Sequence, residues 1–219
     1  MVTVVIGIKE KSQRVPKKNF KLLDNKPLYS WILDTLVSVD EIVEIFLNIE
    51  GKTLIEKIKS DYKNVKKIRV FERNEDLIGH KTPMTDIINS TIQFSKTDTI
   101  LNTHVTNPFL SRNSIRGAIN LFNKEKKPVF SVNSHQSRFY DEDLNPLNHN
   151  INKLIQTQDL EIMYEENSCL YIFEKKEFIS NKIRVFSNSI VYPINKIEAV
   201  DIDTQEDWEL AETIARGLS

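Results

Sequence analysis

Short apolar runs rich in β-branched residues alternate with segments of helical spacing along most of this chain. The apolar runs span residues 2–8, 42–49, 67–71, 99–103 and 128–132. Segments of helical spacing lie between them, at residues 26–37, 53–62, from Thr82-Pro83 onward, and 111–123. A repeated order of strand and helix is typical of a mostly parallel sheet with helices on both faces. The sequence therefore predicts an α/β fold.

The alternation stops between residues 133 and 167, which are polar and irregular. We expect this stretch to form an arm, in the shape of a hairpin, inserted into a single domain that spans residues 1–219. Further strands are predicted after the arm, at residues 168–174, 189–192 and 199–202. A helix over residues 204–216 closes the chain, with Thr204 as its N-cap and Asp207 in the position that a capping box uses.

Composition excludes several classes of protein. The chain has 219 residues, 40% of them hydrophobic, and a single cysteine, Cys169, which excludes an internal disulfide and favours a reducing compartment. We interpret Cys169 as a packing residue of a strand. No apolar stretch approaches the roughly 18 residues of a membrane span, and the first residues lack the charge order of a signal peptide, so we expect a cytoplasmic protein. The net charge of −1 argues against nucleic acid as a partner.

A basic loop follows the first predicted strand. Residues 9–26 carry six lysines and Arg14 against only Glu10 and Asp24. In parallel sheets, ligands bind at the carboxyl ends of strands, where this loop must lie. A triphosphate there needs cations and polar donors, and suitable ones are Lys9, Ser12, Arg14, Lys18 and Asn19. The alternative is a solvated loop without a ligand.

Two aspartates stand at the end of the last predicted strand. Alternation along a strand would point Asp201 and Asp203 to one face, with Ile202 toward the core. Two carboxylates on one face suit Mg²⁺, which prefers carboxylate and phosphate oxygens. The alternative is that Asp203 only favours the dipole of the following helix.

These motifs resemble those of nucleotide-sugar cytidylyltransferases of the acylneuraminate type. The basic loop, with its S-x-R-x-P-x-K-N spacing, resembles the signature A-R-x-G-S-K-R-x-P-x-K-N, with Lys9 in place of an arginine and Gln13 in place of a lysine. The segment from Asp201 to Glu212 resembles the family's I-D-I-D-x-x-x-D-x-x-x-A-E. The resemblance implies a Rossmann-like nucleotidyltransferase fold, with Asp201 and Asp203 as ligands of Mg²⁺ or another divalent cation.

Three shorter segments extend the resemblance over nearly the whole chain. Residues 71–77 resemble R-P-x-x-L, residues 104–108 resemble Q-P-T-S-P, and residues 156–173 resemble R-R-Q-D-L-P followed by N-G-x-I-Y-I. They imply a nucleotide contact at Arg73 and a sugar pocket that contains His104, Asn107, Gln158 and Asn167. A surface arginine and a structural histidine are the alternatives at positions 73 and 104. Thr157 stands where the family has an arginine, whose loss affects recognition of the sugar's carboxylate. Arg138 or a residue of a partner chain is a hypothetical substitute in that role.

The resemblance implies an enzyme that transfers CMP from CTP to the anomeric hydroxyl of an acidic 2-keto sugar, a nonulosonate or a Kdo-like sugar, and releases pyrophosphate. Its catalytic residues would be Arg14, Lys18 and Asp203. It also implies a homodimer in which the arm at 133–167 helps close the neighbour's pocket. Two other functions stay open: a glycosyltransferase that uses a nucleotide-sugar, and a binding protein without chemistry.

Overall fold

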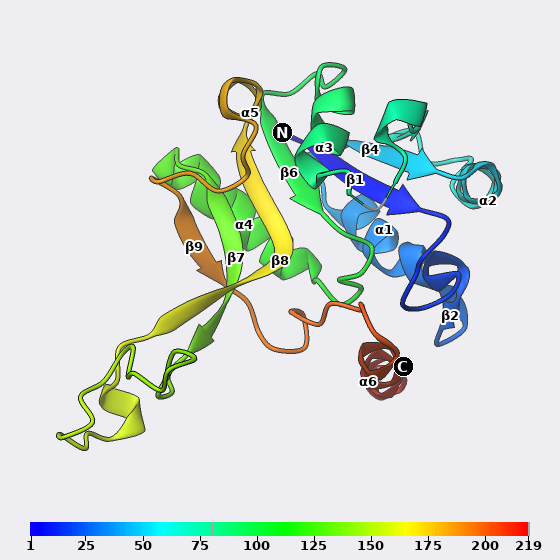
Figure 1. Ribbon diagram of the computed structural model, residues 1–219. Coiled ribbons are helices and arrows are strands. Elements are labelled where there is room, and N and C mark those ends of the chain that lie inside the picture. Colours follow the sequence, from blue (N-terminus) through cyan, green and yellow to red (C-terminus); the bar gives the residue numbers. More distant parts are fainter. Residues whose placement is uncertain (80, 219) are drawn as a thin grey trace.

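A seven-stranded sheet forms the centre of the computed structural model, which describes residues 1–79 and 81–218 (Figure 1). The strands lie in the order β5-β4-β1-β6-β8-β7-β9. Their bounds are Val2–Lys9 for β1, Ile42–Glu50 for β4, Ile68–Glu72 for β5, Thr99–Thr103 for β6, Val129–His135 for β7, Met163–Glu174 for β8 and Ile190–Pro193 for β9. The short strands β2 (Leu22–Leu23) and β3 (Lys26–Pro27) form a separate two-stranded sheet.

Helices cover both faces of the large sheet, as the sequence predicts. Their bounds are Leu28–Ser38 for α1, Lys52–Asp61 for α2, Met84–Ile92 for α3, Arg112–Glu125 for α4, Lys175–Asn181 for α5 and Gln205–Leu218 for α6. Buried apolar residues of α1, α2 and α4 belong to one core cluster, and those of α3 and α5 belong to another. The two clusters lie on opposite faces because neighbouring residues of each strand point to opposite sides.

The sheet is parallel except at β8. This strand runs antiparallel to both β6 and β7, whereas the pairs β1–β4, β1–β6, β4–β5 and β7–β9 are parallel. A shift of register between Phe130 and Val132 bends the β7–β8 pair, and Ser168 beside it has a positive φ of 58°. The prediction of a mostly parallel sheet is confirmed.

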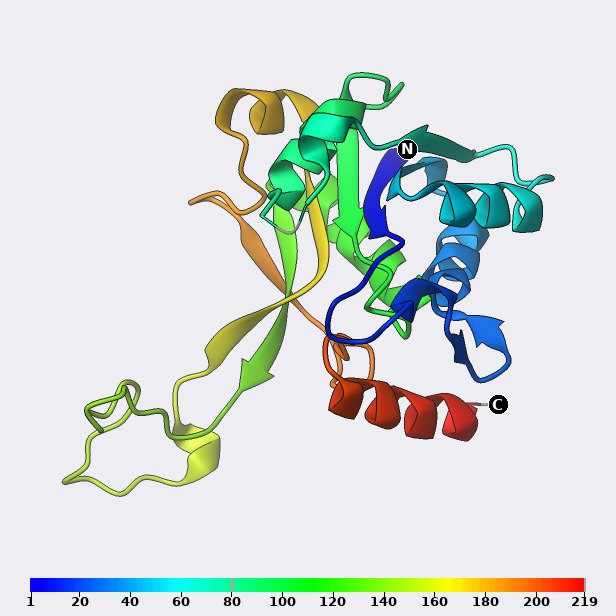
Figure 2. The ribbon, with the colours of Figure 1, turned by 45° about the vertical axis from the view of Figure 1, so that its right-hand side comes forward.

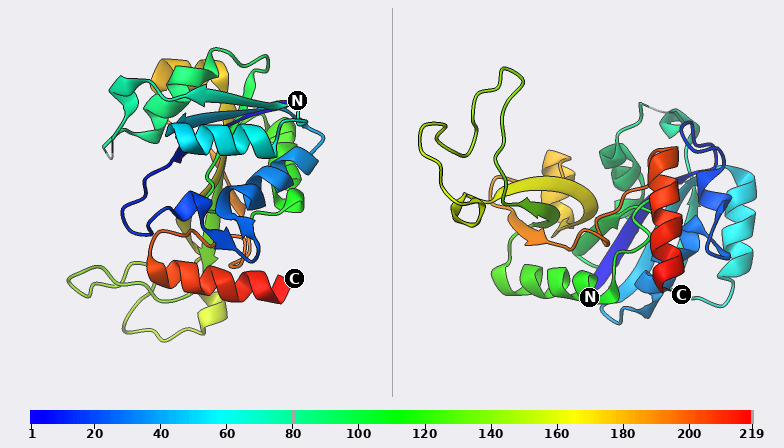
Figure 3. Two further views of the ribbon diagram at one scale, coloured as in Figure 1. Left: turned by 90° about the vertical axis from the view of Figure 1, so that its right-hand side faces the viewer. Right: turned by 90° about the horizontal axis from the view of Figure 1, so that it is seen from below.

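The arm is the prolongation of β7 and β8. The two strands stay paired from Asn133 with Glu165 to His135 with Met163, and the chain between them forms an irregular loop that stands away from the sheet (Figure 2). That loop contains one 3₁₀ turn, Thr157–Asp159, and an isolated bridge between Tyr140 and Pro146. The view from below in Figure 3 shows it far from α6 and the N-terminal strand.

Three local predictions are wrong. Residues 199–202 form no strand, because Ile202 bonds the carbonyl oxygen of Thr106 through its amide and has no neighbouring strand to pair with. The cap of α3 is Pro83 rather than Thr82, and α1 begins after Pro27. Helix α5 is not predicted, since its seven residues present only Phe178 to the core.

Helix α6 closes the molecule against a third core cluster, which contains the fully buried Trp208 and Ile202. The carboxylate of Asp207 accepts hydrogen bonds from the backbone amide and the hydroxyl of Thr204. In return, the backbone amide of Asp207 donates to the Thr204 hydroxyl at 3.2 Å. The predicted capping role of Asp207 is confirmed. Within the described residues, no helix is long and apolar enough to cross a membrane.

Candidate active site

A cavity of about 430 Å³ opens at the carboxyl ends of β1, β5 and β6. The predicted sheet places the ends of these strands together, so residues distant in sequence share one wall. The lining residues are Gly7, Lys9, Lys11, Ser12, Gln13, Arg14, Lys18, Asn19, Arg73, Thr82, Met84, Ile87, His104, Val105, Thr106 and Asp203. All the donors predicted in the basic loop therefore reach the same cavity.

Lys18 joins the basic loop to the segment before α6. Its ammonium group is largely buried and donates to the carbonyl oxygen of Ile202, and its Nζ lies 3.4 Å from Asp203 Oδ1. Burial lowers the pKa of Lys18, and the Asp203 carboxylate opposes that shift. Arg14 Nη2 lies 3.0 Å from the other oxygen of Asp203. Asp203 thus bridges two cations at the cavity wall.

Asp201 lies deeper than Asp203. Its Oδ1 atom is buried and has no hydrogen-bond partner in the described part of the chain. Burial raises the pKa of Asp201, a hydrogen bond from Thr106 opposes the shift, and the neighbouring Asp203 adds to it. A buried carboxylate oxygen without a partner costs free energy unless a cation or donor reaches it.

This pair of carboxylates fits a divalent cation that shares its coordination with a substrate. The described residues contain no cluster of three His, Cys, Asp or Glu side chains that could hold a metal alone. Mg²⁺ usually binds through one or two carboxylates together with phosphate oxygens. Asp201 and Asp203 would supply the carboxylates of such a site, although only Asp203 is among the residues that line the cavity.

Asn19 and Lys9 shape the opposite side of the basic loop. The Asn19 amide donates to the Lys9 carbonyl oxygen at 2.6 Å, and Asn19 Oδ1 is buried without a partner in the described residues. Lys9 Nζ donates to the carbonyl oxygen of Gly79 at 2.6 Å. Burial lowers the pKa of Lys9, and Glu50 opposes this shift. Asn19 therefore fixes the course of the loop, and its side chain lines the cavity.

Arg73 is a buried residue rather than the surface arginine that was its alternative reading. Its guanidinium donates to the side chain and carbonyl oxygen of Asn48, to Glu50 at 3.0 Å and to the carbonyl oxygen of Ile8. Four of the five N–H groups of an arginine are thereby used, which leaves one for a ligand. Arg73 ties the ends of β1, β4 and β5 together beneath the cavity.

His104 connects the cavity to an arginine that the sequence analysis missed. Arg184 Nη1 lies 3.3 Å from His104 Nε2 and donates to Asn102 Oδ1 at 3.0 Å. Burial, aided by the charge of Arg184, lowers the pKa of His104 to about 4. His104 is therefore neutral near pH 7 and accepts from Arg184 through Nε2. The only sequence signal for Arg184 is a charged residue set among the apolar residues Ile183 and Val185.

Three of the residues predicted to form the sugar pocket do not line this cavity. Asn107 is fully buried and donates to the carbonyl oxygen of Val200. Asn167 accepts from Ser131 Oγ at 2.6 Å and donates to Asn133, so it supports the bend of β7 and β8. Gln158 lies exposed on the arm and donates to Gln156.

Replacing His104 by glutamine is expected to flatten the pH dependence of stability. The unfolded chain holds His104 at a pKa near 6.5, so between pH 6.5 and 4 it binds more protons than the folded protein does. The free energy of unfolding therefore falls as the pH falls through that window, by about 3 kcal/mol as an upper bound. Arg184, Lys18 and Asp203 are the charged groups that act on His104.

The measurement is urea unfolding of the wild type and His104→Gln at pH 7 and pH 4.5. Carboxylates shared by both proteins contribute equally, so the comparison isolates position 104. Glutamine keeps an acceptor for Arg184, and the variant should lose less stability on acidification. An equal loss in the two proteins would contradict the assigned pKa.

Comparison with known proteins identifies the family of this chain. A family model described as cytidylyltransferase matches residues 4–217. The chain belongs to the cytidylyltransferase family. It is thus an enzyme of the nucleotidyltransferase class, and the predicted family is confirmed. The match covers the basic loop, the cavity and the Asp201–Asp203 segment together.

Two curated relatives align with nearly all of this cytidylyltransferase. A CMP-N,N'-diacetyllegionaminic acid synthase from Legionella pneumophila is 28% identical over 233 residues, covering 97% of this chain and 95% of the relative. An N-acylneuraminate cytidylyltransferase A from Danio rerio is 24% identical over 96% of this chain. The alignment covers 50% of the Danio rerio protein, so this chain spans about half of its length.

Solved structures share the fold at low sequence identity. A CMP:2-keto-3-deoxy-manno-octonic acid synthetase complexed with CTP has a TM-score of 0.70 at 11% identity, with 100% of this chain and 99% of the other covered. A 4-diphosphocytidyl-2C-methyl-D-erythritol synthase from Anaerococcus prevotii has a TM-score of 0.67 at 16% identity, with 98% of each chain covered. Both confirm the α/β nucleotidyltransferase fold.

Proposed function

We propose that this cytidylyltransferase transfers CMP from CTP to the anomeric hydroxyl of an acidic 2-keto sugar and releases pyrophosphate. The observation that carries the proposal is the bridge of Asp203 between Arg14 and Lys18 in the wall of the cavity. Support comes from the two curated relatives, named as a legionaminic acid CMP-synthase and an N-acylneuraminate cytidylyltransferase. A nonulosonate or Kdo-like sugar is therefore the proposed acceptor.

The basic loop would hold the triphosphate. Lys9, Ser12, Arg14 and Lys18 place cations and a hydroxyl around one cavity, and such donors neutralise phosphate charge and fix the α-phosphorus for in-line attack. Arg14 and Lys18 both pair with Asp203. Binding of phosphates would let both cations divide their charge between the ligand and Asp203. Arg73, which lines the cavity, has one remaining N–H group that would contact the nucleotide.

Asp201 and Asp203 would hold Mg²⁺ or another divalent cation. When bound, such an ion screens phosphate charge and orients the α-phosphate. Lys18 then has a second role, because its bond to the Ile202 carbonyl oxygen fixes the backbone between the two carboxylates. No covalent intermediate is required, and the only cysteine, Cys169, is buried with its thiol pKa raised by burial.

The arm is the proposed link to a second copy of the chain. Gln158 lies on it, away from the cavity of its own chain, and would reach a sugar only in a neighbour's pocket. Exposed apolar residues of the arm would be covered in such a homodimer, namely Leu144, Leu147, Ile151 and Leu154. Sedimentation of the purified protein as a monomer at assay concentration would contradict this arrangement.

The deciding experiment measures pyrophosphate release with Mg²⁺. CTP is compared with ATP, GTP and UTP, and each is paired with a panel of nonulosonates and Kdo. We expect release only with CTP and one class of acidic sugar, with a CMP-sugar as the second product. CTP binding without release for any sugar would instead favour a binding protein, and consumption of a nucleotide-sugar would favour a glycosyltransferase.

A further inference from the structure

The guanidinium of Arg184 forms no ion pair with a carboxylate of the described residues. It comes from the segment between α5 and β9, and its Cζ lies 4.0 Å from the centre of the Tyr171 ring. Both hydrogens of Nη1 are used, by Asn102 and His104. The three N–H groups of Nε and Nη2 have no partner among residues 1–79 and 81–218.

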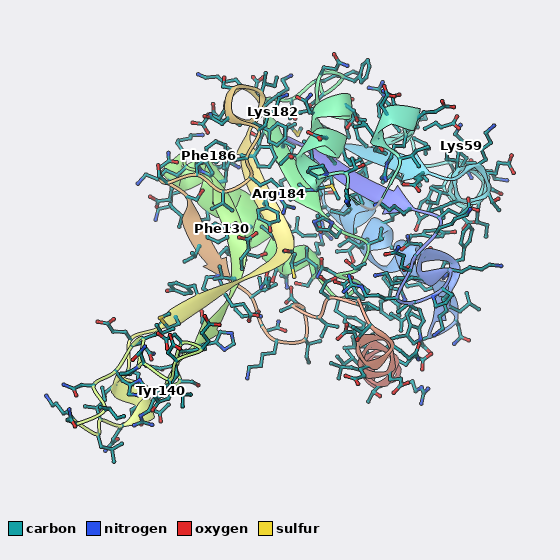
Figure 4. The ribbon with its side chains drawn as sticks, in the orientation of Figure 1. Lys59, Phe130, Tyr140, Lys182, Arg184 and Phe186 are labelled. Carbon is teal, nitrogen blue, oxygen red and sulfur yellow. The ribbon has the colours of Figure 1, made fainter. Side chains whose placement is uncertain are left out.

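Contacts within the chain fix the position of Arg184. Stacking on Tyr171 and two hydrogen bonds hold the guanidinium over the pair of β6 and β8, where Asn102 lies opposite Tyr171. Figure 4 shows Arg184 in front of β8, on the side of the sheet where Phe130 and Phe186 also lie. A planar guanidinium held in this way offers its free edge, formed by Nε and Nη2, to a planar anion without a large loss of side-chain entropy.

His104 links Arg184 to the cavity, because it lines the cavity and contacts Arg184, which is not itself among the lining residues. His104 lines the cavity and lies within electrostatic reach of Lys18, Asp203 and Arg184 together. Lys18 and Asp203 mark the side where the phosphates are proposed to bind. Arg184 is a further cation in contact with His104. The hypothetical substitute from the sequence analysis, Arg138, instead donates to the carbonyl oxygen of Ile155 within the arm.

We propose that Arg184 binds the carboxylate of the acidic sugar; the inference rests on the proposed function. In the ring form of a 2-keto acidic sugar, the carboxylate and the anomeric hydroxyl are attached to the same carbon. A residue that binds the carboxylate therefore also orients the hydroxyl that attacks the α-phosphorus. Arginine suits this task because its fork matches the two carboxylate oxygens. Arg184 accordingly determines the preference for an acid over a neutral sugar.

The test compares an acid with its neutral analogue in two variants. The sugar that the wild type uses best, and its derivative with the carboxylate converted to a primary amide, are assayed with wild type, Arg184→Gln and Arg184→Lys. For the acid, kcat/KM should fall about 100-fold in Arg184→Gln, because a charge-assisted bidentate contact is lost. For the acid, the kcat/KM of Arg184→Lys should lie between those of the wild type and Arg184→Gln, since lysine keeps the positive charge and loses the planar fork of N–H groups. For the amide, wild type and Arg184→Gln should agree within about threefold.

Lys182→Gln is the matched control, because it removes one positive charge from the exposed start of the same segment. The Lys182→Gln variant should keep the wild-type kcat/KM for both sugars, and the KM for CTP should stay the same in all variants. An equal loss for acid and amide would overturn the proposal and leave Arg184 as a support for His104. Turnover by the wild type with an unaffected Arg184→Gln would overturn this inference alone. No turnover by the wild type with any acidic sugar would overturn the proposed function, and this inference with it.

Discussion

Asp203→Asn is expected to reduce the rate of pyrophosphate release at least about 100-fold, the loss typical when a charged group that stabilises a transition state is removed. Asparagine keeps the shape of the side chain and removes its charge. Arg14, 3.0 Å away, and Lys18, 3.4 Å away, would lose their shared partner, and the proposed cation site would lose one of its two carboxylates. The measurement is steady-state release with CTP and the preferred sugar over a range of Mg²⁺ concentrations.

Asp98→Asn is the control for this prediction. Its side chain is 97% exposed and lies just before β6, at the end of the strand opposite the cavity. The control should keep the activity of the wild type at every Mg²⁺ concentration. We allow a margin of roughly threefold for assay error. If the activity of Asp203→Asn lies within that margin of the wild type, Asp203 does not belong to the proposed site.

Arg73→Met is expected to lower the free energy of unfolding by about 3 kcal/mol, since one partner of a buried ion pair is left without its counterion. The Arg73 side chain is 1% exposed, and the substitution removes four hydrogen bonds to the ends of β1 and β4. For a chain of this length, such a loss corresponds to a fall in Tm of about 10 °C. Thermal unfolding followed by circular dichroism measures it.

Arg112→Met is the matched control, because Arg112 forms an ion pair with Asp40 at 2.9 Å on the exposed surface. Surface pairs contribute about 0–1 kcal/mol, so its Tm should change by only a few degrees. The double variant Arg73→Met/Glu50→Leu should recover part of the lost stability, since no charge then stays unpaired. A Tm shift of Arg73→Met no larger than that of Arg112→Met would contradict the structural role of Arg73.

Features that depend on short stretches of sequence could be predicted. The apolar runs of the sequence identify β1, β4, β5 and β6. Most residues of β1, β4 and β6 are buried, whereas β5, at the edge of the sheet, is partly exposed. The predicted helix at residues 111–123 corresponds to α4, whose N-cap is Ser111; the hydroxyl of Ser111 accepts from the amide of Ser114 at 3.1 Å. The basic loop could also be placed, since it directly follows β1. Strand ends of a parallel sheet meet at one edge, so the cavity followed from the order of elements.

The direction of β8 was decided by the tertiary structure. Its apolar run is the same whether the strand is parallel or antiparallel, and only the return of the chain through the arm sets its direction. The segment around Asp201 likewise looks like a strand by composition. It lies outside the sheet because the Ile202 amide bonds the backbone of Thr106 and the Ile202 carbonyl accepts from Lys18.

The roles of single polar residues depended on contacts between distant segments. Arg73 could not be recognised as buried, because its partners Ile8 and Asn48 lie on other strands. Arg184 meets His104 only through the packing of the α5–β9 segment on β8, about which local sequence carries no information. The sequence by itself therefore determined the elements, the family resemblance and the basic loop, since these depend on periodicity and spacing. The tertiary structure decided burial, charge pairing and the pKa of His104, because these depend on which side chains long-range folding brings together.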